Sequence, residues 1–543
     1  MTKTSYDLLI KNGMVVDGAG NPWYRSDIAI KEGKIVKIRP QLNEEATSEI
    51  DATGLVVCPG FIDMHSHTDF ILAFYSKMDS FIRQGITTAV VGMCGQTLAP
   101  IHPERVAEFK QLFTSFLPTG GDIKIQWNSF EEYLDKMEKT RVPSNLVFFV
   151  GYQPIRIAAG LAFENRPPTS EEMEKMKEYV AEAMEAGAFG LSTGLIYSPQ
   201  VFAKTDEIIE LAKVAAEYNG LYFSHIRGEG ENLINSVKEL IEIVEKSGCI
   251  GGQIAHHKVS GARYWGTSKE TIRLMEEANE RGLSITCDQY PFNRGQSGLI
   301  TALPPWVQEG GTDKILERLK DPEILKQIKK DVAEGIEGWE NWIKDNGFER
   351  IFITFVKNKD WKAIEGKNIS EITKIKGKSD DWETIFAVLL DNDAGVPITI
   401  ETMGEDDIRR IMTSRYQMIG TDGAGVPHLA GLKAFHPRFF GTYPRILGRY
   451  VREEKLLTLE EVIRKMTSFP AQRLGLSDRG LIKEGMWADI VVFNPDTVID
   501  VATYENPHQF PEGILHVIVN GMVVVENNKQ KRVFPGKILR RPY

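Results

Sequence analysis

The sequence has few cysteines and no long apolar run. Its 543 residues include only four cysteines, none of them in a Cys-x-x-Cys pair. This usage excludes a disulfide framework and a zinc ribbon, and it favours a reducing compartment such as the cytoplasm. No stretch approaches about 18 uninterrupted apolar residues, and the first residues, MTKTSYDLLI, lack the apolar core and cleavage site of a signal peptide. We therefore expect neither a membrane span nor secretion.

Clustered positive charge is also missing. Sixty-five Lys and Arg residues stand against 75 Asp and Glu, which gives a net charge of −10, and no basic stripe alternates with aromatic residues. Such a chain is poorly suited to neutralise a phosphate backbone, so we expect no nucleic-acid partner. The 42% of hydrophobic and 26% of charged residues are typical of a globular protein with a large core. Nothing in the sequence defines an oligomeric state.

Short apolar runs alternate with amphipathic helical segments through the middle of the chain. The runs are residues 55–62, 86–92, 146–150, 188–191, 221–224, 252–255, 283–287 and 417–420. Nearly continuous apolar residues are typical of strands that are buried on both faces, and their alternation with helices indicates a parallel sheet. The economical arrangement of eight such strands is an α/β fold in which they close into a (β/α)8 TIM barrel.

The two ends of the chain resemble each other. Residues 12–16 recur as 520–524, each time within an apolar strand, an Asn-Gly turn and a second apolar strand. A chance match between two β-rich ends is the alternative. We expect residues 1–57 and 476–543 to form a small β-sandwich beside a catalytic barrel at residues 58–475. Residues 298–415 exceed one strand-to-strand connection, which predicts an insertion after the seventh strand that can act as a lid.

Residues that can bind a metal follow five of the eight apolar runs. In a TIM barrel, the active site lies at the C-terminal ends of the strands. After runs one, two, five, six and eight come His65 and His67, Cys94, His225, His256 and Asp422, respectively. Each residue alone has an ordinary structural explanation, such as a buried thiol or an aspartate that forms a turn. Together they predict a metal site, and thiolate and imidazole ligands suit zinc.

These residues lie within longer motifs that resemble the amidohydrolase superfamily and, within it, the D-aminoacylase (N-acyl-D-amino-acid deacylase) branch. The resemblance covers nearly the whole chain through motifs that include PGFIDMHSHTD, ITTAVVGMCG, GAFGLSTGLIY, SHIRGEG, AHHKVSG and MIGTDGAG. It implies zinc-dependent hydrolysis of the amide bond of small N-acyl-D-amino acids, which yields a carboxylate and a free D-amino acid. The D configuration rests on this resemblance alone.

The resemblance also implies how the metal is held. One tightly bound zinc is expected on Cys94, His225 and His256. A second site, weaker or vacant, would be formed by the other three residues, His65, His67 and Asp422. Many members of the superfamily bridge two metals with a carboxylated lysine after strand four, but this chain has GLSTG there. The thiolate of Cys94 is then expected to be the bridge.

Further roles concern catalysis and the binding of substrate. Asp422 is expected to take a proton from the attacking water and to deliver it to the leaving nitrogen, because an amide anion is a poor leaving group. Lys258 lies two residues after His256, so on an extended strand end its ammonium would enter the same cavity. The resemblance gives Tyr290 and Arg438 the same task as Lys258, recognition of the substrate carboxylate, and a guanidinium suits a carboxylate.

Two positions depart from the branch. After strand three the chain has Gly-Tyr-Gln-Pro where the branch usually has Gly-His-Gly-Thr, so Tyr152 occupies the place of a histidine. Arg294 stands in a tract that family members fill with small hydroxyl residues. We therefore include Tyr152 and Arg294 among the candidate substrate-binding residues, and Arg294 raises the hypothesis of an anionic substrate side chain.

Three alternatives remain beside the deacylase hypothesis. The segment Gly190-Leu-Ser192-Thr-Gly194 matches the G-x-S-x-G elbow of serine hydrolases, but no helix follows it directly. Cyclic-amide hydrolases such as hydantoinases and dihydroorotases share the barrel and the metals, and the missing strand-four lysine argues against them. The third alternative is a non-catalytic binding protein that has kept the scaffold.

Overall fold

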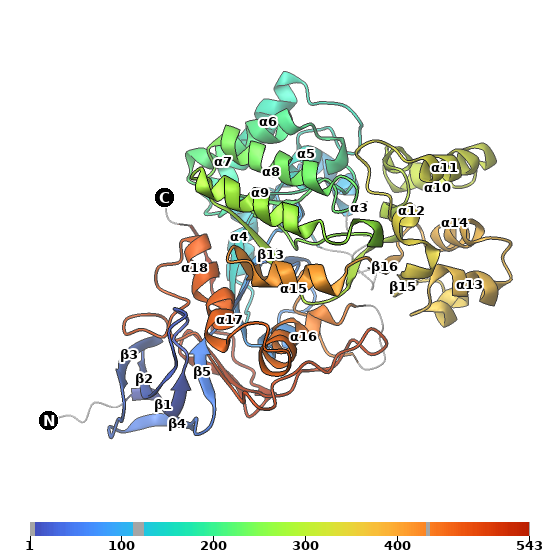
Figure 1. Ribbon diagram of the computed structural model, residues 1–543. Coiled ribbons are helices and arrows are strands. Elements are labelled where there is room, and N and C mark those ends of the chain that lie inside the picture. Colours follow the sequence, from blue (N-terminus) through green and yellow to red (C-terminus); the bar gives the residue numbers. More distant parts are fainter. Residues whose placement is uncertain (1–5, 112–123, 430–434, 542–543) are drawn as a thin grey trace.

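The computed structural model describes residues 6–111, 124–429 and 435–541. Figure 1 shows a central α/β body, a sheet at one end and a mostly helical lobe at the other. Within the described ranges, no helix is both long enough and apolar enough to cross a membrane.

The central body is a barrel of parallel strands. Its strands are β6 (Phe61–Asp63), β7 (Ile86–Val91), β8 (Asn145–Phe148) with β9 (Val150–Gly151), β10 (Gly190–Gly194), β11 (Leu221–His225), β12 (Gly252–Ile254), β13 (Ile285–Gln289) and β17 (Gln417–Ile419). The recorded pairings between these strands are parallel. The amide of Met64 donates to the carbonyl of Ile419 (3.2 Å) and joins the first strand to the last. The predicted (β/α)8 fold class is thereby confirmed.

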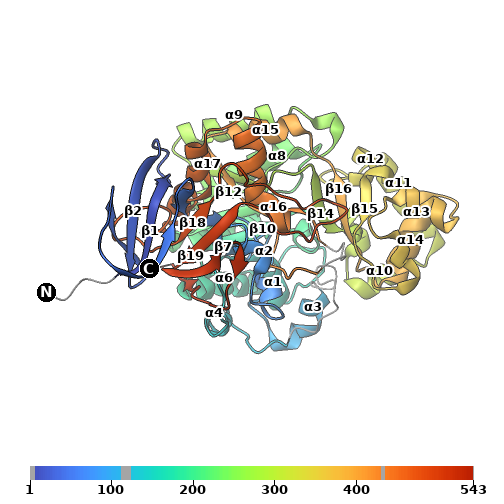
Figure 2. The same ribbon diagram turned by 90° about the horizontal axis from the view of Figure 1, so that it is seen from below.

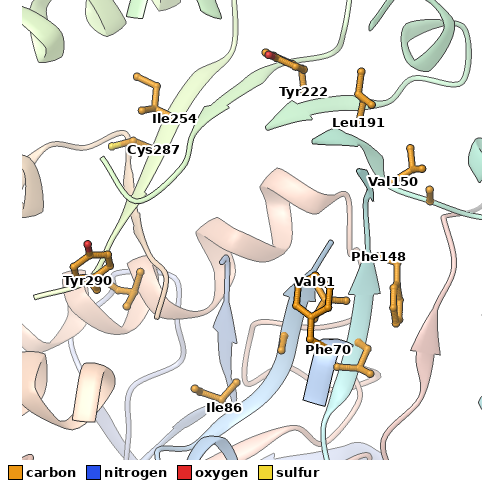
Figure 3. Packing of buried hydrophobic residues seen from close by; sticks show 14 of the residues in the cluster. Phe70, Ile86, Val91, Phe148, Val150, Leu191, Tyr222, Ile254, Cys287 and Tyr290 are labelled. Atoms are coloured by element: carbon orange, nitrogen blue, oxygen red, sulfur yellow. The ribbon is translucent and has the colours of Figure 1, made fainter. Parts of the chain in front are cut away.

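Helices cover the outside of the barrel. The larger ones are α4 (Phe130–Glu138), α6 (Ser170–Glu185), α7 (Thr205–Glu217), α8 (Leu233–Ser247), α9 (Ser268–Glu280), α15 (Glu405–Thr413) and α17 (Leu459–Met466); shorter ones are α1 (Asp69–Leu72), α2 (Asp79–Ile82), α3 (Val106–Gln111), α5 (Tyr152–Ala158), α16 (Arg438–Arg445) and α18 (Ser468–Leu474). α6 begins with a capping box between Thr169 and Glu172. Figure 3 shows Phe148, Leu191 and Tyr222 on neighbouring strands, within the apolar core that these helices help to bury.

Both ends of the chain build one nine-stranded sheet. It contains β1 (Tyr6–Val15), β2 (Tyr24–Lys31), β3 (Lys34–Arg39), β4 (Ala46–Asp51), β5 (Val56–Pro59), β18 (Ile490–Phe493), β19 (Ile514–Val519), β20 (Met522–Glu526) and β21 (Lys529–Gln530). β1 pairs with β2 along one edge and with both β4 and β5 along the other, so the sheet divides. β5 lies between β1 and β18, and Figure 2 shows strands from the two ends of the chain side by side.

Two details of this sheet differ from the sequence-based expectation. The predicted strand at 55–62 is two strands, of which β5 belongs to the terminal sheet and β6 to the barrel. Gly60 lies between the two strands, and an added Cβ there would lie only 2.1 Å from Oγ1 of Thr87. The short strand β22 (Ile538–Leu539) also leaves the terminal sheet and pairs with β8 of the barrel.

The insertion after the seventh barrel strand is a lobe with its own core. It contains the antiparallel strands β14 (Arg294–Gly298), β15 (Ile351–Ile353) and β16 (Pro397–Glu401) and the helices α10 (Thr312–Arg318), α11 (Pro322–Glu334), α12 (Trp342–Asn346), α13 (Ile369–Lys376) and α14 (Asp381–Asp391). The lobe stands at the opposite end of the molecule from the terminal sheet (Figures 1 and 2). Its strands begin at Arg294, four residues before the predicted limit of 298.

Candidate metal centre

The backbone at three barrel strand ends is left-handed. Cys94 has φ 55°, His256 has φ 34° and Asp422 has φ 48°. Such a conformation costs about 1–3 kcal/mol at a non-glycine residue and is concentrated at functional sites. At the first of these turns, Nε2 of Gln200 donates to the carbonyl of Cys94 (2.9 Å), while its Oε1 accepts from the amide of Gly194 (2.6 Å). This side-chain amide holds the turn that bears the thiol against the end of β10.

The ends of β6 and β17 are joined by backbone hydrogen bonds. The amide of Asp422 donates to the carbonyl of His65 (2.8 Å), and the amide of His67 donates to the carbonyl of Gly423 (2.7 Å). These bonds bring together three side chains that can bind a metal, His65, His67 and Asp422, although more than 350 residues separate the two histidines from the aspartate in the chain. Nε2 of His67 lies 3.2 Å and Nε2 of His65 lies 3.6 Å from Oδ1 of Asp422.

The thiol of Cys94 faces three imidazoles. Its Sγ lies 3.3 Å from Nε2 of His65, 3.5 Å from Nε2 of His256 and 3.8 Å from Nδ1 of His225. With Zn–S near 2.3 Å and Zn–N near 2.0–2.1 Å, tetrahedral zinc separates sulfur and nitrogen ligands by about 3.6 Å. The donors present therefore fit zinc in both chemistry and spacing. His65 belongs to both groups of donors, that around Cys94 and that around Asp422.

The charges of the cluster favour ionised ligands. Burial alone would raise the pKa of the Cys94 thiol, but the nearby His65 and His256 outweigh burial and hold this pKa well below its usual value. Burial likewise opposes ionisation of Asp422. Here the adjacent Arg438 guanidinium, with Nη1 2.9 Å from Oδ2, is the leading cause that holds the pKa of the carboxyl well below its ordinary range. A thiolate and a carboxylate are thus both available to a cation.

Sequence reasoning missed Asp288, which supports two of the imidazole residues. Its Oδ1 accepts a hydrogen bond from the amide of His256 (2.8 Å) and lies 3.3 Å from Nδ1 of His65. A carboxylate behind one nitrogen of an imidazole orients the other nitrogen toward a metal. Asp288 is the penultimate residue of β13. It could have been predicted in the same way as the other candidates, as a polar residue at the C-terminal end of a barrel strand.

Glu229 is a second residue that the sequence did not single out. Its Oε1 lies 2.6 Å from Nζ of Lys258, 3.2 Å from Nδ1 of His256 and 3.7 Å from Nε2 of His225. The amide of Glu229 donates to Oε2 of Glu340 in the lobe (2.5 Å). The sequence does show a glutamate in the SHIRGEG motif close to His225. It does not show the direction of the side chain, because a turn separates the two residues.

Two connected cavities surround the metal-type cluster, by which we mean the candidate metal ligands His65, His67, Cys94, His225, His256 and Asp422. The first has a volume of about 740 Å³, including space open to solvent. Of the two cavities, the residues that line only this one are His67, Cys94, Gln96, Arg438, Phe70, Ile71, Pro397, Ala424, Phe435 and Phe439. The second, about 370 Å³, has His225, Glu229, His256, Lys258 and Tyr290 among its lining residues. Both are lined by Tyr197, Gln296, Ser297 and Asp422, which mark their junction. Tyr197, also missed from the sequence, meets His225 edge to face at 4.9 Å between ring centroids.

Three candidate substrate-binding residues meet around one aromatic ring. The guanidinium carbon of Arg438 lies 4.6 Å and Nζ of Lys258 lies 5.8 Å from the ring centre of Tyr290. Two cations beside a phenol form a suitable receptor for a carboxylate.

The other two candidates make different contacts. Tyr152 begins α5 with its hydroxyl against Glu207 and Arg156, and it does not line either of the two cavities described above. Arg294 is stacked on Phe352 (3.7 Å) and Tyr504 (4.2 Å), and it too lies outside both linings. Both side chains already have partners in structural contacts, so the geometry argues against a direct role for either in binding substrate.

The serine of the G-x-S-x-G segment is not placed as a nucleophile. Ser192 is fully buried, and its hydroxyl donates to the carbonyl of Gly92 and accepts from the amide of Gly95 (3.1 Å). Its side chain thus ties β10 to the turn that bears the thiol.

Fold and site together define a metal-dependent hydrolase built on a (β/α)8 barrel. The model of the Amidohydrolase family matches residues 48–280 and 355–525. The chain is 33% identical to D-aminoacylase of Alcaligenes xylosoxydans xylosoxydans, with 99% of this chain and 98% of the relative covered. It is 34% identical to N-acyl-D-glutamate deacylase of the same organism, with 98% and 96% covered. The chain therefore belongs to the amidohydrolase family.

A solved structure supports this assignment. The crystal structure of N-acyl-D-glutamate deacylase from Bordetella bronchiseptica, complexed with zinc and a phosphonate inhibitor that mimics the tetrahedral intermediate, superposes with a TM-score of 0.81 at 31% identity. The match covers 99% of this chain and 100% of that one.

Proposed function

We propose that this protein hydrolyses the amide bond of N-acyl-D-amino acids in a zinc-dependent reaction, releasing a carboxylate and a free D-amino acid. The observation that carries the proposal is the arrangement at the junction of the two cavities. There, the Asp422 carboxylate lies beside a cluster of one thiol and imidazoles, within reach of a receptor for a carboxylate. The full-length similarity to deacylases of N-acyl-D-amino acids supports the configuration of the substrate.

One zinc ion is proposed to be held by Cys94, His225 and His256, and a second, weaker site by His65, His67 and Asp422. Zinc in such a site polarises a carbonyl group and lowers the pKa of water to about 7. Sγ of Cys94 lies 3.5 Å from His256 and 3.8 Å from His225, which supports the first site. His65 lies 3.3 Å from the same Sγ and groups with either Cys94 or Asp422, so it can contribute to both sites.

The remaining steps belong to the protein. Asp422, kept ionised by Arg438, accepts a proton from the attacking water and returns it to the leaving nitrogen. Lys258, Tyr290 and Arg438 bind the carboxylate of the substrate and so hold the amide bond at the cavity junction. Tyr197 lines both cavities, and its proposed role is to donate a hydrogen bond to the oxygen that gains charge.

The end of β10 argues against a hydrolase of cyclic amides with a lysine-bridged centre. That strand ends in Ser192, Thr193 and Gly194, and the Thr193 hydroxyl donates to Oγ of Ser224 (2.9 Å). The thiol of Cys94 faces the imidazoles instead. All four cysteines are unpaired thiols, and this supports a reducing compartment, for which we propose the cytoplasm.

One preparation assayed in two ways tests the function. Metal content per chain is measured by elemental analysis, and kcat/KM is measured for N-acetyl-D-methionine and N-acetyl-L-methionine. We expect at least one zinc per chain and turnover of the D isomer only, and incubation with a chelator should abolish it. Turnover that survives removal of the metal, or turnover of the L isomer at an equal rate, would refute the proposal.

A further inference from the structure

The two cavities at the metal-type cluster differ in chemistry. The smaller one is lined by Tyr290 and Lys258 of the carboxylate receptor, whereas Arg438, the third residue of the receptor, lines the larger one. The larger one is apolar at its far end, where Phe70, Ile71, Ala424 and Phe439 contribute to the wall. Phe439 and Ala424 belong to a buried apolar cluster, against which Ile71 packs. This division of chemistry carries an inference about the substrate.

The covalent order of an N-acyl amino acid matches the order of the cavities. Along the molecule come the carboxylate, Cα with its side chain, the amide nitrogen, the carbonyl carbon and the acyl chain. With the carboxylate at Tyr290 and the amide beside Asp422 at the junction, the acyl chain continues past Cys94 into the larger cavity. The amino-acid side chain, which leaves from Cα, stays on the side of Lys258.

The charged side chains of the larger cavity already have partners, and Arg438 is in addition assigned to the carboxylate of the amino-acid part of the substrate. Arg438 faces Asp422 at 2.9 Å, and His67 faces the same carboxylate at 3.2 Å. A charged acyl group in this cavity would be desolvated against Phe70 and Phe439 without a partner of its own, which is costly. An acetyl group would bring only one methyl to the apolar wall of this cavity, and a longer chain would cover more of it.

We infer that the larger cavity is an acyl subsite, and that the enzyme prefers N-acyl-D-amino acids whose acyl group is a medium-length apolar chain over their N-acetyl and anionic counterparts. The inference rests on the proposed function and adds the class of acyl group. Ile71 and Phe439 are then residues that determine this specificity.

The test compares four acyl groups on one amino acid. For wild-type protein, kcat/KM is measured with N-acetyl-, N-butanoyl-, N-pentanoyl- and N-succinyl-D-methionine. Each fully buried methylene is worth about fourfold. We expect the pentanoyl compound to exceed the acetyl compound at least tenfold, and the succinyl compound, which has a terminal carboxylate, to fall below both. The inference is overturned if kcat/KM for the pentanoyl compound does not exceed that for the acetyl compound, or if the succinyl and pentanoyl compounds have equal kcat/KM. Either result leaves the deacylase function in place.

A matched pair of variants places the effect in the cavity. Ile71→Trp fills the larger cavity and should lower the ratio of pentanoyl to acetyl kcat/KM toward one. Ile375→Trp makes the same change at a 55% exposed position of the lobe and should leave the ratio unchanged. An unchanged ratio in Ile71→Trp overturns the assignment of the subsite. If Ile71→Trp does not fold, the wild-type series still tests the inference. If the wild-type protein hydrolyses none of the four acyl derivatives, both the proposed function and the inference are refuted.

Discussion

Replacement of Glu229 by glutamine should make the affinity for substrate depend on pH. Burial alone would lower the pKa of the Lys258 ammonium, but the Glu229 carboxylate at 2.6 Å outweighs burial and raises this pKa above its ordinary value. Removing one partner of a buried ion pair costs about 3–5 kcal/mol. The same energy corresponds to a fall in the pKa of Lys258 of roughly 2 to 4 units, since one unit is about 1.4 kcal/mol.

The consequence is measurable in KM. In Glu229→Gln, Lys258 should lose its proton as the pH is raised toward 10, and a neutral amine no longer attracts the substrate carboxylate. We expect KM for N-acetyl-D-methionine to rise over this range in the variant, and to stay flat in the wild type because Lys258 remains charged. Steady-state kinetics from pH 7 to 10 measure this difference.

A matched control separates this effect from a general loss of stability. Glu239→Gln removes another carboxylate that faces a cation, here Arg227 at 2.8 Å. It should lower the melting temperature and leave the pH dependence of KM as in the wild type. A KM of Glu229→Gln that is independent of pH would refute the role assigned to Lys258, and a pH-dependent KM in the control would refute the assignment to this ion pair.

Three further predictions concern the metal and the lobe. Asp422→Asn should lower kcat by about 10²- to 10⁴-fold and keep the tightly bound zinc; normal turnover in this variant would exclude Asp422 as the base. Cys94→Ala should lose that zinc, as measured by metal analysis after dialysis, and retention of a full equivalent would show that other ligands suffice. Burial and the neighbouring Glu229 raise the pKa of Glu340 to about 7. Because the folded state binds this proton more tightly than the unfolded state, whose pKa is about 4.3, the free energy of unfolding should fall as pH rises from about 4 to 7. Glu340→Gln should remove part of this decline in denaturant titrations, and an unchanged slope would contradict it.

The barrel and its metal-type residues could be predicted from the sequence because both depend on local signals. Buried parallel strands are short apolar runs, and a residue just after such a run reaches the C-terminal rim whatever the length of chain between strands. His225 and His256 are close in space for this reason alone. The adjacent His257 illustrates the same rule, since its Nε2 lies 2.8 Å from the Thr271 hydroxyl on α9, away from the other imidazoles.

Other features depend on contacts that a local pattern does not contain. The run at 55–62 contains Pro59 and Gly60, and the chain leaves the terminal sheet at this point and enters the barrel, a division that the apolar pattern alone did not indicate. Tyr152 directly follows a barrel strand, as the candidate metal ligands do. Its hydroxyl, however, is hydrogen-bonded to the buried Arg156 and Glu207. Arg294 begins β14, whose Gln296 and Ser297 line the cavities, but its own guanidinium is stacked on two aromatic rings and is absent from both linings.

The barrel contributes the proposed metal ligands and base, and the lobe contributes part of the cavity wall. Each proposed ligand and the proposed base lie at the end of a barrel strand, where backbone hydrogen bonds between neighbouring strands set their positions. Gln296 and Ser297 at the cavity junction come from β14 of the lobe, and Ile400 in the smaller cavity comes from β16. Within the described residues, these lobe strands pair with each other and not with the barrel strands, so changes in β14 or β16 can reshape the cavities without altering the backbone hydrogen bonds at the strand ends. Glu340 is different, because it accepts a hydrogen bond from the amide of Glu229 beside the imidazoles. The arrangement thus allows the selection of substrates to vary while the chemistry at the strand ends is retained.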